Sequence, residues 1–253
     1  MTDPSELRTI AADVASSVGR EVAVRRANGF SWSTKSSATD VVTEIDTWSE
    51  DEVVSRISAL RPDDGFLGEE GTNRESRSGV TWVIDPVDGT TNLLYDIPGY
   101  SVSIAASVDG TPVAGAVFDP IRGELFSAAL GAGATRDGDP ISASTKADLA
   151  TALVGTGFSY MAEARRGQAE QLVTILPLIR DIRRAGGAAM DLCDVACGRL
   201  DAYYERGLSP WDSAAGGLIA TEAGARVVDG TLTAASAPGL ADEFFALLDS
   251  VGA

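Results

Sequence analysis

The chain has 253 residues, 44% of them hydrophobic, and its 37 acidic and 20 basic side chains give a formal net charge of −17. A chain of this length can bury a sizeable core as one large domain or two smaller ones. No apolar run approaches the roughly 18 residues that span a bilayer, and the acidic N-terminus lacks an apolar signal segment. The negative charge argues against nucleic acids or anionic membranes as the main partner.

The sequence contains no histidine and two cysteines, Cys193 and Cys197. Without histidine, the chain has no Ser-His-Asp or Cys-His nucleophile and no histidine-ligated zinc. The spacing of the cysteines continues a helical apolar face, so we interpret both as small core side chains of a protein in the reducing cytoplasm. Any metal would be held by oxygen atoms, which favours hard ions such as Mg²⁺, Mn²⁺ or Ca²⁺.

The first predicted helix begins near the N-terminus of the chain. Asp3 stands at the N-cap position and Pro4 at the first helical position, which is a preferred arrangement for a helix start. Apolar residues then recur at helical spacing from Leu7 to Val22, as expected for a helix with one buried face. We expect this helix to end near Asn28 and to serve packing only.

A second amphipathic helix is predicted up to Leu60, ending before Pro62. Thr39 or Asp40 is expected to cap it, because both residue types are favoured at helix starts. Asp46 then lies inside the helix, where an isolated acid is normally exposed to solvent. Taken alone, Asp46 therefore carries no functional prediction.

An acidic pair, Glu69 and Glu70, follows a short apolar segment and is flanked by Gly68 and Gly71. The pair fits an ordinary polar turn between two glycines. It could also supply a carboxylate to the same ion as Asp85, which comes later in the chain. The polar residues 72–79 are predicted to form a loop.

The chain is organised around residues 82–92, which read Trp-Val-Ile-Asp-Pro-Val-Asp-Gly-Thr-Thr-Asn. The β-branched run predicts the end of a buried strand, stopped by Pro86 because proline has no N–H for the ladder. Asp85 and Asp88 would then project from the rim of a sheet, where open α/β sheets bind ligands. Two carboxylates this close repel each other unless a cation lies between them or one is protonated. A divalent cation is the simplest answer.

The backbone N–H groups of Gly89 and Thr90 are placed to bind an anion after these acids. An alternative stays open, because Asp-Pro and Asp-Gly are common turn dipeptides and either acid could simply cap a turn. The whole string of strand, acids and small polar residues is more specific than either acid alone.

The remaining chain divides into two predicted parts. Antiparallel strands joined by turns are predicted at residues 101–108, 111–118 and 123–129. Residues 144–149 are the expected boundary between two subdomains. Beyond it, strands are predicted at residues 152–155, 182–184, 200–205 and 226–228, and helices at 162–179, 186–198, 211–223 and 241–248. This alternation predicts an α/β second half.

Two acids of the second half stand at the ends of predicted elements. Glu205 ends a strand directly after Tyr203 and Tyr204, where a polar rim residue is unremarkable. Asp212 follows Trp211 at the start of a helix, where the helix dipole alone would explain an acid.

Four segments together resemble the inositol monophosphatase family of Mg²⁺-dependent, lithium-sensitive phosphatases. Residues 82–92 are similar to that family's motif W-x-I-D-P-x-D-G-T-x-N, and residues 211–216 to its motif W-D-x-A-A-G. Residues 39–46 and 68–70 are similar to two upstream acidic motifs of the family. Four such strings in the family's order and spacing make the resemblance cover most of the chain.

The resemblance implies an α/β (α+β) fold, the layered α-β-α-β-α sandwich of the inositol monophosphatase and fructose-1,6-bisphosphatase type. Residues 1–145 would form a subdomain with a large antiparallel sheet and most metal ligands. Residues 146–253 would form a smaller α/β subdomain that supplies Asp212 and Glu205. The resemblance also implies a homodimer that acts on a small sugar or polyol phosphate.

The resemblance further implies two or three Mg²⁺ ions per site, which Mn²⁺ could replace. Glu69, Asp85 and the backbone carbonyl of Val87 would bind one ion. Asp85, Asp88 and Asp212 would bind a second, with Asp85 bridging the two. Glu69 would also help to hold a weaker third ion through water.

For catalysis, the resemblance implies that Asp46 and Thr90, with Glu69, orient or deprotonate the attacking water. The N–H groups of Gly89 and Thr90 would hold the phosphate, and Lys35 stands where the family often places a lysine near the metal waters. Since no nucleophile is implied by the motifs, we predict direct in-line attack by metal-activated water rather than a phosphoenzyme.

For the substrate, the resemblance favours inositol-1-phosphate. Glu205 matches a glutamate that hydrogen-bonds inositol hydroxyls in one subgroup, and Gly187 and Ala188 fall where the family contacts the ring. Asp88 and Asp212 are expected to contact the substrate as well. Gly187 stands where relatives often have serine or threonine, so a hydroxyl contact would be missing there.

Rival functions stay open at this point. Fructose-1,6-bisphosphate, histidinol phosphate or a 3′-phosphonucleotide could be the substrate of the same chemistry. From another class, the chain could be a non-catalytic regulatory binding protein on a phosphatase scaffold. The complete acidic set argues against that reading, because a binding module has no need for four carboxylates that repel one another without metal.

Overall fold

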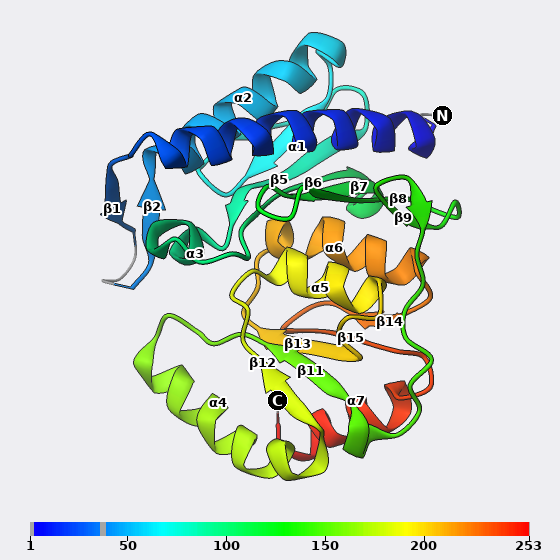
Figure 1. Cartoon of the computed structure of the whole chain (residues 1–253). Helices are drawn as coiled ribbons and strands as arrows, with labels where there is room; N and C mark the ends of the chain where they lie inside the picture. Colours follow the sequence, from blue (N-terminus) through cyan, green and yellow to red (C-terminus); the bar gives the residue numbers. More distant parts are fainter. Residues whose placement is uncertain (1–2, 36–38, 253) are drawn as a thin grey trace.

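The computed structural model describes residues 3–35 and 39–252 (Figure 1). The α-helices of this part are α1 (Pro4–Ala27), α2 (Glu44–Leu60), α3 (Thr90–Tyr95), α4 (Ala162–Ile175), α5 (Ala188–Ala196), α6 (Pro210–Glu222) and α7 (Ala241–Ser250). Short 3-10 turns span Leu149–Thr151 and Leu176–Leu178. None of the described helices is both long and apolar enough to cross a membrane.

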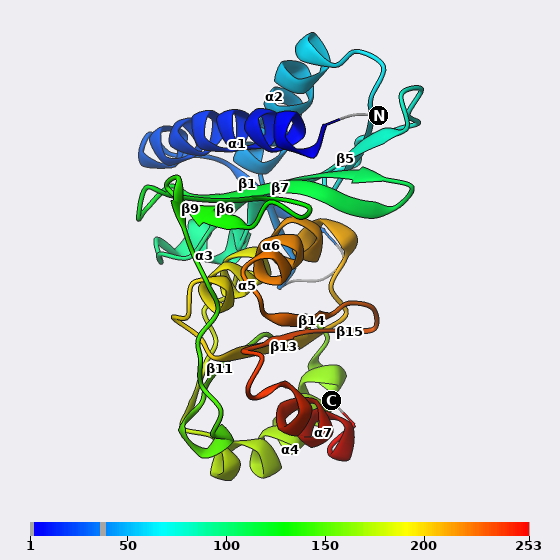
Figure 2. The same ribbon diagram turned by 90° about the vertical axis from the view of Figure 1, so that its right-hand side faces the viewer.

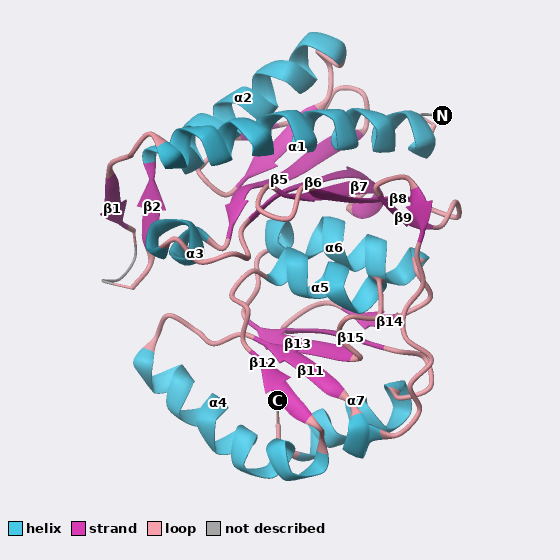
Figure 3. Cartoon of the chain, in the orientation of Figure 1, coloured by secondary structure: helices cyan, strands magenta, loops and turns pink. Residues whose placement is uncertain are grey.

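The elements stack in five layers, as two perpendicular views show (Figures 1 and 2). Helices α1 and α2 cover one face of a large sheet, and α5 and α6 lie between this sheet and a smaller one. Helices α4 and α7 cover the outer face of the smaller sheet. Coloured by secondary structure, the alternation of helix and strand layers is evident (Figure 3). The predicted α-β-α-β-α sandwich is confirmed.

The large sheet has eight strands in the order β10-β9-β8-β7-β6-β5-β3-β4. These strands are β3 (Gly65–Gly68), β4 (Asn73–Arg74), β5 (Val80–Asp88), β6 (Ser101–Val108), β7 (Thr111–Asp119), β8 (Glu124–Ala129), β9 (Ala134–Arg136) and β10 (Asp139–Pro140). Its neighbours pair antiparallel except β3 and β5, which run parallel. The three antiparallel strands predicted after the central motif are β6, β7 and β8.

Strand β5 is buried on both faces. Trp82 and Ile84 pack into the core under α1 and α2, whereas Val83 packs into the core on the side of α5 and α6. Because both faces are covered, the strand reads as a continuous apolar run rather than an alternating one. Burial on both sides holds β5 in place, and with it Asp85 and Asp88 in its last four residues.

The smaller sheet has five strands in the order β12-β11-β13-β15-β14. They are β11 (Leu153–Thr156), β12 (Asp181–Arg183), β13 (Ala202–Arg206), β14 (Arg226–Val228) and β15 (Leu232–Ser236). Strand β11 runs parallel to β12 and β13, and β15 runs antiparallel to β13 and β14. The α/β character predicted for the second half is therefore found, but β15 was not predicted. Its two alanines and its serine give a weak strand signal, and pairing on both edges stabilises it.

The second helix begins later than predicted. Helix α2 starts at Glu44 with Thr43 as its N-cap, so the expected cap at Thr39 or Asp40 is wrong. Residues before it form β2 (Val41–Thr43), which pairs antiparallel with β1 (Trp32–Thr34). The β-branched run favours a strand here, and Thr43 forms a capping box that fixes the helix start.

Pro86 does not end the strand that contains it. Strand β5 continues through Pro86 to Asp88, and its register against β6 shifts between Asp85 and Asp88. The proline thus interrupts the ladder locally, as expected from its missing N–H, without stopping the strand. The predicted strand end at Pro86 is therefore wrong, because the strand ends at Asp88. The loop predicted at residues 72–79 likewise contains the short strand β4.

Candidate active site

The first component of the site is the acidic end of β5. Asp85 and Asp88 are buried, with exposed fractions of 1% and 7%. The Asp88 carboxylate accepts the N–H groups of Ala188 at 3.2 Å and Ala189 at 2.8 Å, at the N-terminus of α5. A Cβ at Gly187 would lie 3.0 Å from Asp88 Oδ2, so the small residue permits this close approach. Asp88 therefore joins the large sheet to the helix layer below it.

The turn after Asp88 is built on Gly89, whose φ of +88° suits glycine. A Cβ there would lie 2.6 Å from the carbonyl oxygen of Gly99. The Asn92 side chain donates to that same oxygen at 2.7 Å and to the carbonyl of Ala185 at 2.9 Å. Asn92 thus ties the turn that starts α3 to the segment before α5. Sequence reasoning gave it no role, although it is the last residue of the central motif.

Thr90 and Asp46 form a hydrogen-bonded pair. The Thr90 hydroxyl lies 2.8 Å from Asp46 Oδ1 and 3.0 Å from the Val87 carbonyl oxygen. Asp46 Oδ2 accepts the Thr43 N–H at 2.9 Å and also the Thr43 hydroxyl. Asp46 is fully buried, and it closes the capping box of α2. Its burial raises its pKa, and the hydrogen bonds from Thr43 and Thr90 oppose that rise.

Glu69 lies in the turn after β3 and contacts Lys35. The Lys35 ammonium is 3.0 Å from Glu69 Oε1 and also pairs with Glu70. Burial would lower the pKa of Lys35, but the charges of Glu69 and Glu70 outweigh it and raise that pKa. Burial raises the pKa of Glu69, against the effect of Lys35. Lys35 and Glu69, which sequence reasoning assigned to one site, are thus in contact.

Glu50 of α2 holds the turn that contains Glu69 and Glu70. Sequence reasoning did not predict this role. Its buried carboxylate accepts the N–H groups of Glu70 at 2.7 Å and Thr72 at 2.8 Å. A Cβ at Gly68 would lie 2.4 Å from the same carboxylate, so glycine is needed there. The one sequence signal was a glycine directly before an acidic pair, which common turns also show.

Asp212 reaches the site from the N-terminus of α6. Its Oδ2 accepts the Ser209 N–H at 2.6 Å and closes a capping box. Burial and then the charges of Glu69, Asp88 and Asp212 raise the pKa of Asp85 well above its ordinary value. The structure therefore brings these four acids, distant in sequence, into one electrostatic cluster.

The same cluster perturbs its other members. Burial, with the charge of Asp212, raises the pKa of Asp88 to about 8. Burial raises the pKa of Asp212 to about 7, where the Ser209 N–H acts in the opposite direction. Carboxylates this mutually repulsive require protons or a cation to be stable together.

The acid cluster fits a hydrated divalent cation. In the part of the chain that the structure describes, no three acidic side chains form a ready-made metal cluster. Mg²⁺ needs no all-protein cage, because it keeps several of its waters and shares its coordination between them and carboxylate oxygens. Buried carboxylates with raised pKa values, beside the carbonyl of Val87, are a donor set made only of oxygen. That set suits Mg²⁺ or Mn²⁺.

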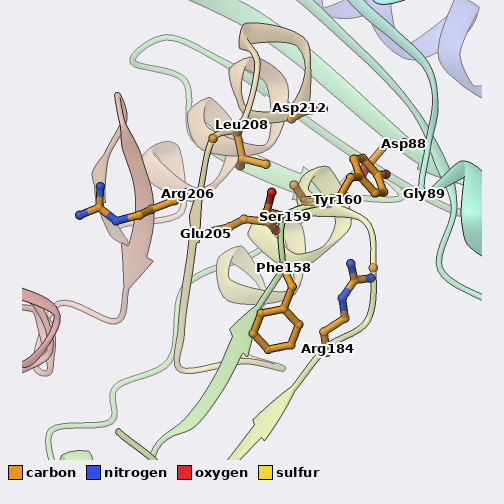
Figure 4. A pocket seen from close by; sticks show the side chains of 13 residues that line it. Asp88, Gly89, Phe158, Ser159, Tyr160, Arg184, Glu205, Arg206, Leu208 and Asp212 are labelled. Carbon is orange, nitrogen blue, oxygen red and sulfur yellow. Dashed lines mark hydrogen bonds between the residues drawn. The ribbon is translucent and has the colours of Figure 1, made fainter. Parts of the chain in front are cut away.

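A pocket opens beside the acids (Figure 4). Asp88, Gly89 and Asp212 line it together with Ala188 and Glu205. Glu205 lies across the pocket from Asp88 and Gly89 (Figure 4). Gly187 is not among the described residues that line this pocket; its neighbours Gly186 and Ala188 are. The pocket thus connects the acid cluster to the predicted substrate residue Glu205.

Sequence reasoning missed other residues of this pocket. Phe158, Ser159 and Tyr160 line it from the loop before α4, and Arg184 lines it from the segment before α5. Burial raises the pKa of Tyr160 to about 12, with a contribution from the charge of Asp40. These residues lie outside the acidic motifs, and their loops carry no strong pattern, so only the fold reveals them.

Comparison with known proteins identifies the relationship. Residues 3–245 match the model of the inositol monophosphatase family. The chain belongs to this family. The resemblance inferred from the acidic motifs is thereby confirmed.

Two relatives that are similar to this chain have names of different kinds. The chain is 46% identical over 273 residues to the inositol-1-monophosphatase SuhB of Mycobacterium tuberculosis, covering 97% of this chain and 94% of the relative. It is 42% identical over 208 residues to a protein named Nus factor SuhB from Xylella fastidiosa, covering 82% of this chain and 74% of the relative. Family members similar to this chain thus carry two kinds of name.

The solved structure of Mycobacterium tuberculosis SuhB has the same fold. It superposes with a TM-score of 0.87 at 44% sequence identity, covering 99% of this chain and 98% of that one. The inositol monophosphatase sandwich is therefore the fold of this chain along nearly its whole length.

Proposed function

We propose that the chain is a Mg²⁺-dependent phosphomonoesterase that hydrolyses inositol-1-phosphate to inositol and phosphate. The observation that carries this proposal is the convergence of Glu69, Asp85, Asp88 and Asp212 beside a polar pocket that contains Glu205. Family membership supports phosphatase chemistry, and the name of the Mycobacterium tuberculosis relative supports the substrate.

The proposed metal ligands are the four acids and the carbonyl of Val87, which would hold two or three Mg²⁺ ions, or Mn²⁺ in their place. Bound ions of this kind lower the pKa of water, neutralise the phosphate and stabilise the leaving oxygen. Lys35 would balance the charge of Glu69, with which it pairs.

The chain's own groups would do the rest. The Thr90 hydroxyl donates a hydrogen bond to Asp46, which leaves the lone pairs of the Thr90 oxygen free to accept a hydrogen bond from the attacking water. As Thr90 took a proton from that water, it would pass its own proton to Asp46. The N–H groups of Gly89 and Thr90 would bind the phosphate, because they stand at the start of α3, where N–H groups have no partner within the helix. Glu205 would accept hydrogen bonds from polyol hydroxyls on the far side of the pocket.

Further parts of the proposal come from the family resemblance. They are the division into subdomains at residues 145 and 146, the homodimer, and inhibition by lithium. The competing function is that of a non-catalytic binding protein. The name of the Xylella relative, Nus factor SuhB, supports this alternative. The complete acid cluster favours catalysis.

The test is phosphate release with Mg²⁺ from a substrate panel, with EDTA blanks. The panel is inositol-1-phosphate, fructose-1,6-bisphosphate, histidinol phosphate, a 3′-phosphonucleotide and glycerol-2-phosphate. We expect the highest kcat/KM for inositol-1-phosphate, with EDTA abolishing release. A preference for another ester would replace the substrate and keep the chemistry. The absence of metal-dependent release from every ester would contradict the proposal and favour the binding protein.

A further inference from the structure

The Glu205 side chain is held from two directions where it enters the pocket. It lies near the end of β13, which pairs with β11 in parallel register. Burial raises the pKa of Glu205, and a hydrogen bond from Tyr203 and the charge of Arg184 oppose that rise. A partly buried carboxylate needs such partners, because burial otherwise disfavours its charged form.

The first contact is the hydroxyl of Tyr203. It donates to Glu205 Oε2 at 2.7 Å. Residues two apart on a strand point to the same face of the sheet, so Tyr203 and Glu205 share a face and Tyr204 points to the other. The packing agrees, since Tyr203 belongs to the core next to α5 and α6, and Tyr204 belongs to the core next to α7.

Tyr203 is itself immobilised. Its side chain is fully buried. A Cβ at Gly155 on β11 would lie 3.2 Å from its ring, so the neighbouring strand leaves it little space. A hydroxyl on a ring packed this closely is a fixed donor, and it selects one position for the Glu205 carboxylate.

The second contact is a notch at Gly157, directly after β11. A Cβ at this position would lie 1.8 Å from Glu205 Oε2 and 2.1 Å from Oε1, inside the carboxylate itself. The side chain of Glu205 can therefore occupy its place only because residue 157 is glycine. Among the described residues, Tyr203 is the donor to this carboxylate and bonds Oε2, so Oε1 keeps its hydrogen-bonding capacity in a residue that lines the pocket.

We propose that Tyr203 is a positioning residue that sets substrate specificity: with the notch at Gly157, it fixes Glu205 so that Oε1 faces the hydroxyls of a polyol phosphate. The inference rests on the proposed function, because it concerns the recognition of the same substrate. Tyr203 touches Glu205 and not the reacting atoms, so it affects binding of the polyol and not the chemical step.

The test compares Tyr203→Phe with wild type on inositol-1-phosphate and on p-nitrophenyl phosphate, which lacks polyol hydroxyls. We expect KM for inositol-1-phosphate to rise about tenfold, because a hydrogen bond to a charged group is lost. We expect kcat to stay within about twofold and both constants for p-nitrophenyl phosphate to stay unchanged, because the acid cluster is untouched. Tyr204→Phe is the matched control, since it removes a hydroxyl from the other face of the same strand.

A double-mutant cycle with Glu205→Ala separates positioning from a structural role. If Tyr203 acts through Glu205, then Tyr203→Phe has no further effect on KM in the Glu205→Ala background. An equal loss in that background, or an equal loss on p-nitrophenyl phosphate, would overturn the inference. So would an unchanged KM for inositol-1-phosphate. A wild-type enzyme that does not prefer inositol-1-phosphate over p-nitrophenyl phosphate would overturn the proposed substrate first and this inference with it.

Discussion

The hydroxyl of Thr90 lies between two acceptors, Asp46 Oδ1 and the Val87 carbonyl oxygen, at 2.8 and 3.0 Å. One hydroxyl proton can satisfy one of them fully, so the Thr90 oxygen keeps its lone pairs for a third partner. The N–H and hydroxyl of Thr43 hold the other oxygen of Asp46. The pair is thus oriented by Thr43, which does not line the pocket, and this suits a group that directs a water molecule.

The corresponding prediction concerns the loss of the Thr90 hydroxyl without a change in side-chain shape. Thr90→Val keeps the shape of the side chain, and we expect kcat for inositol-1-phosphate to fall about a hundredfold, the lower range for a lost acid–base contact. Thr90→Ser keeps the hydroxyl and should retain most activity. Circular dichroism of both variants would verify that the fold is unchanged. Full turnover by Thr90→Val would exclude a catalytic role for this pair.

At the level of secondary structure, two helix starts carry the acids of the site. Asp88 binds the first N–H groups of α5 from another segment, and Asp212 closes the capping box of its own helix α6. Both helices thereby present their positive ends to the acid cluster, which moderates the repulsion between the carboxylates. The turn at Gly89 sets the distance between β5 and this helix layer.

That turn gives a prediction about stability. Gly89→Ala places a Cβ 2.6 Å from the carbonyl oxygen of Gly99 and in a left-handed conformation. Gly110→Ala is the matched control, because Gly110 has a φ of +77° and nothing within 4 Å of its added Cβ. We expect the control to lose about 1 kcal/mol of unfolding free energy, and Gly89→Ala at least about 2 kcal/mol more, because a main-chain atom must move. Urea unfolding would measure both, and equal losses would refute the steric argument.

Much of the fold and the cluster could be predicted from the sequence, because strong local signals mark them. The helix start at Asp3 and Pro4 and the apolar run of β5 are local patterns. The motifs also located Asp88 at the end of β5 and Asp212 in the first turn of α6, whereas Asp85 lies inside the strand. The roles of the site residues stay predictions. The motif at residues 39–46 was correctly recognised, yet the start of its helix was misplaced, because a strand competes for the same residues.

The remaining features depend on contacts between distant segments. Glu50 is an ordinary acid of a helix in the sequence, and only the fold places it under the turn at Glu69. Arg184 and Tyr160 belong to loops without a motif, and they meet only because β11 and β12 are neighbours. Strand β15 has weak intrinsic preference and is stabilised by its two partners. Such features have no local signature to find.

On the scale of the whole molecule, charge dominates. The chain carries a net charge of −17, and the buried acids of the site add to its self-repulsion. The pKa values of Asp88 and Asp212 are raised to about 8 and about 7, above the value of about 4 for an unfolded aspartate. Between these limits the folded metal-free chain binds more protons than the unfolded one, so its stability falls as pH rises from about 4 to about 8.

The most direct measurement is thermal unfolding with and without Mg²⁺ between pH 5 and pH 9, at matched ionic strength. Without metal, we expect Tm to fall as pH rises. Mg²⁺ should raise Tm most at pH 8. At a Mg²⁺ concentration one hundred times its Kd, the expected gain in unfolding free energy is about 2.7 kcal/mol. Asp212→Asn keeps an oxygen for the Ser209 N–H, and it should show a smaller Mg²⁺ shift and a shallower fall with pH. Asp13→Asn, an exposed acid on α1, should behave as wild type. No Mg²⁺ shift at pH 8, or an equal shift in Asp212→Asn, would contradict the metal site on which the account rests.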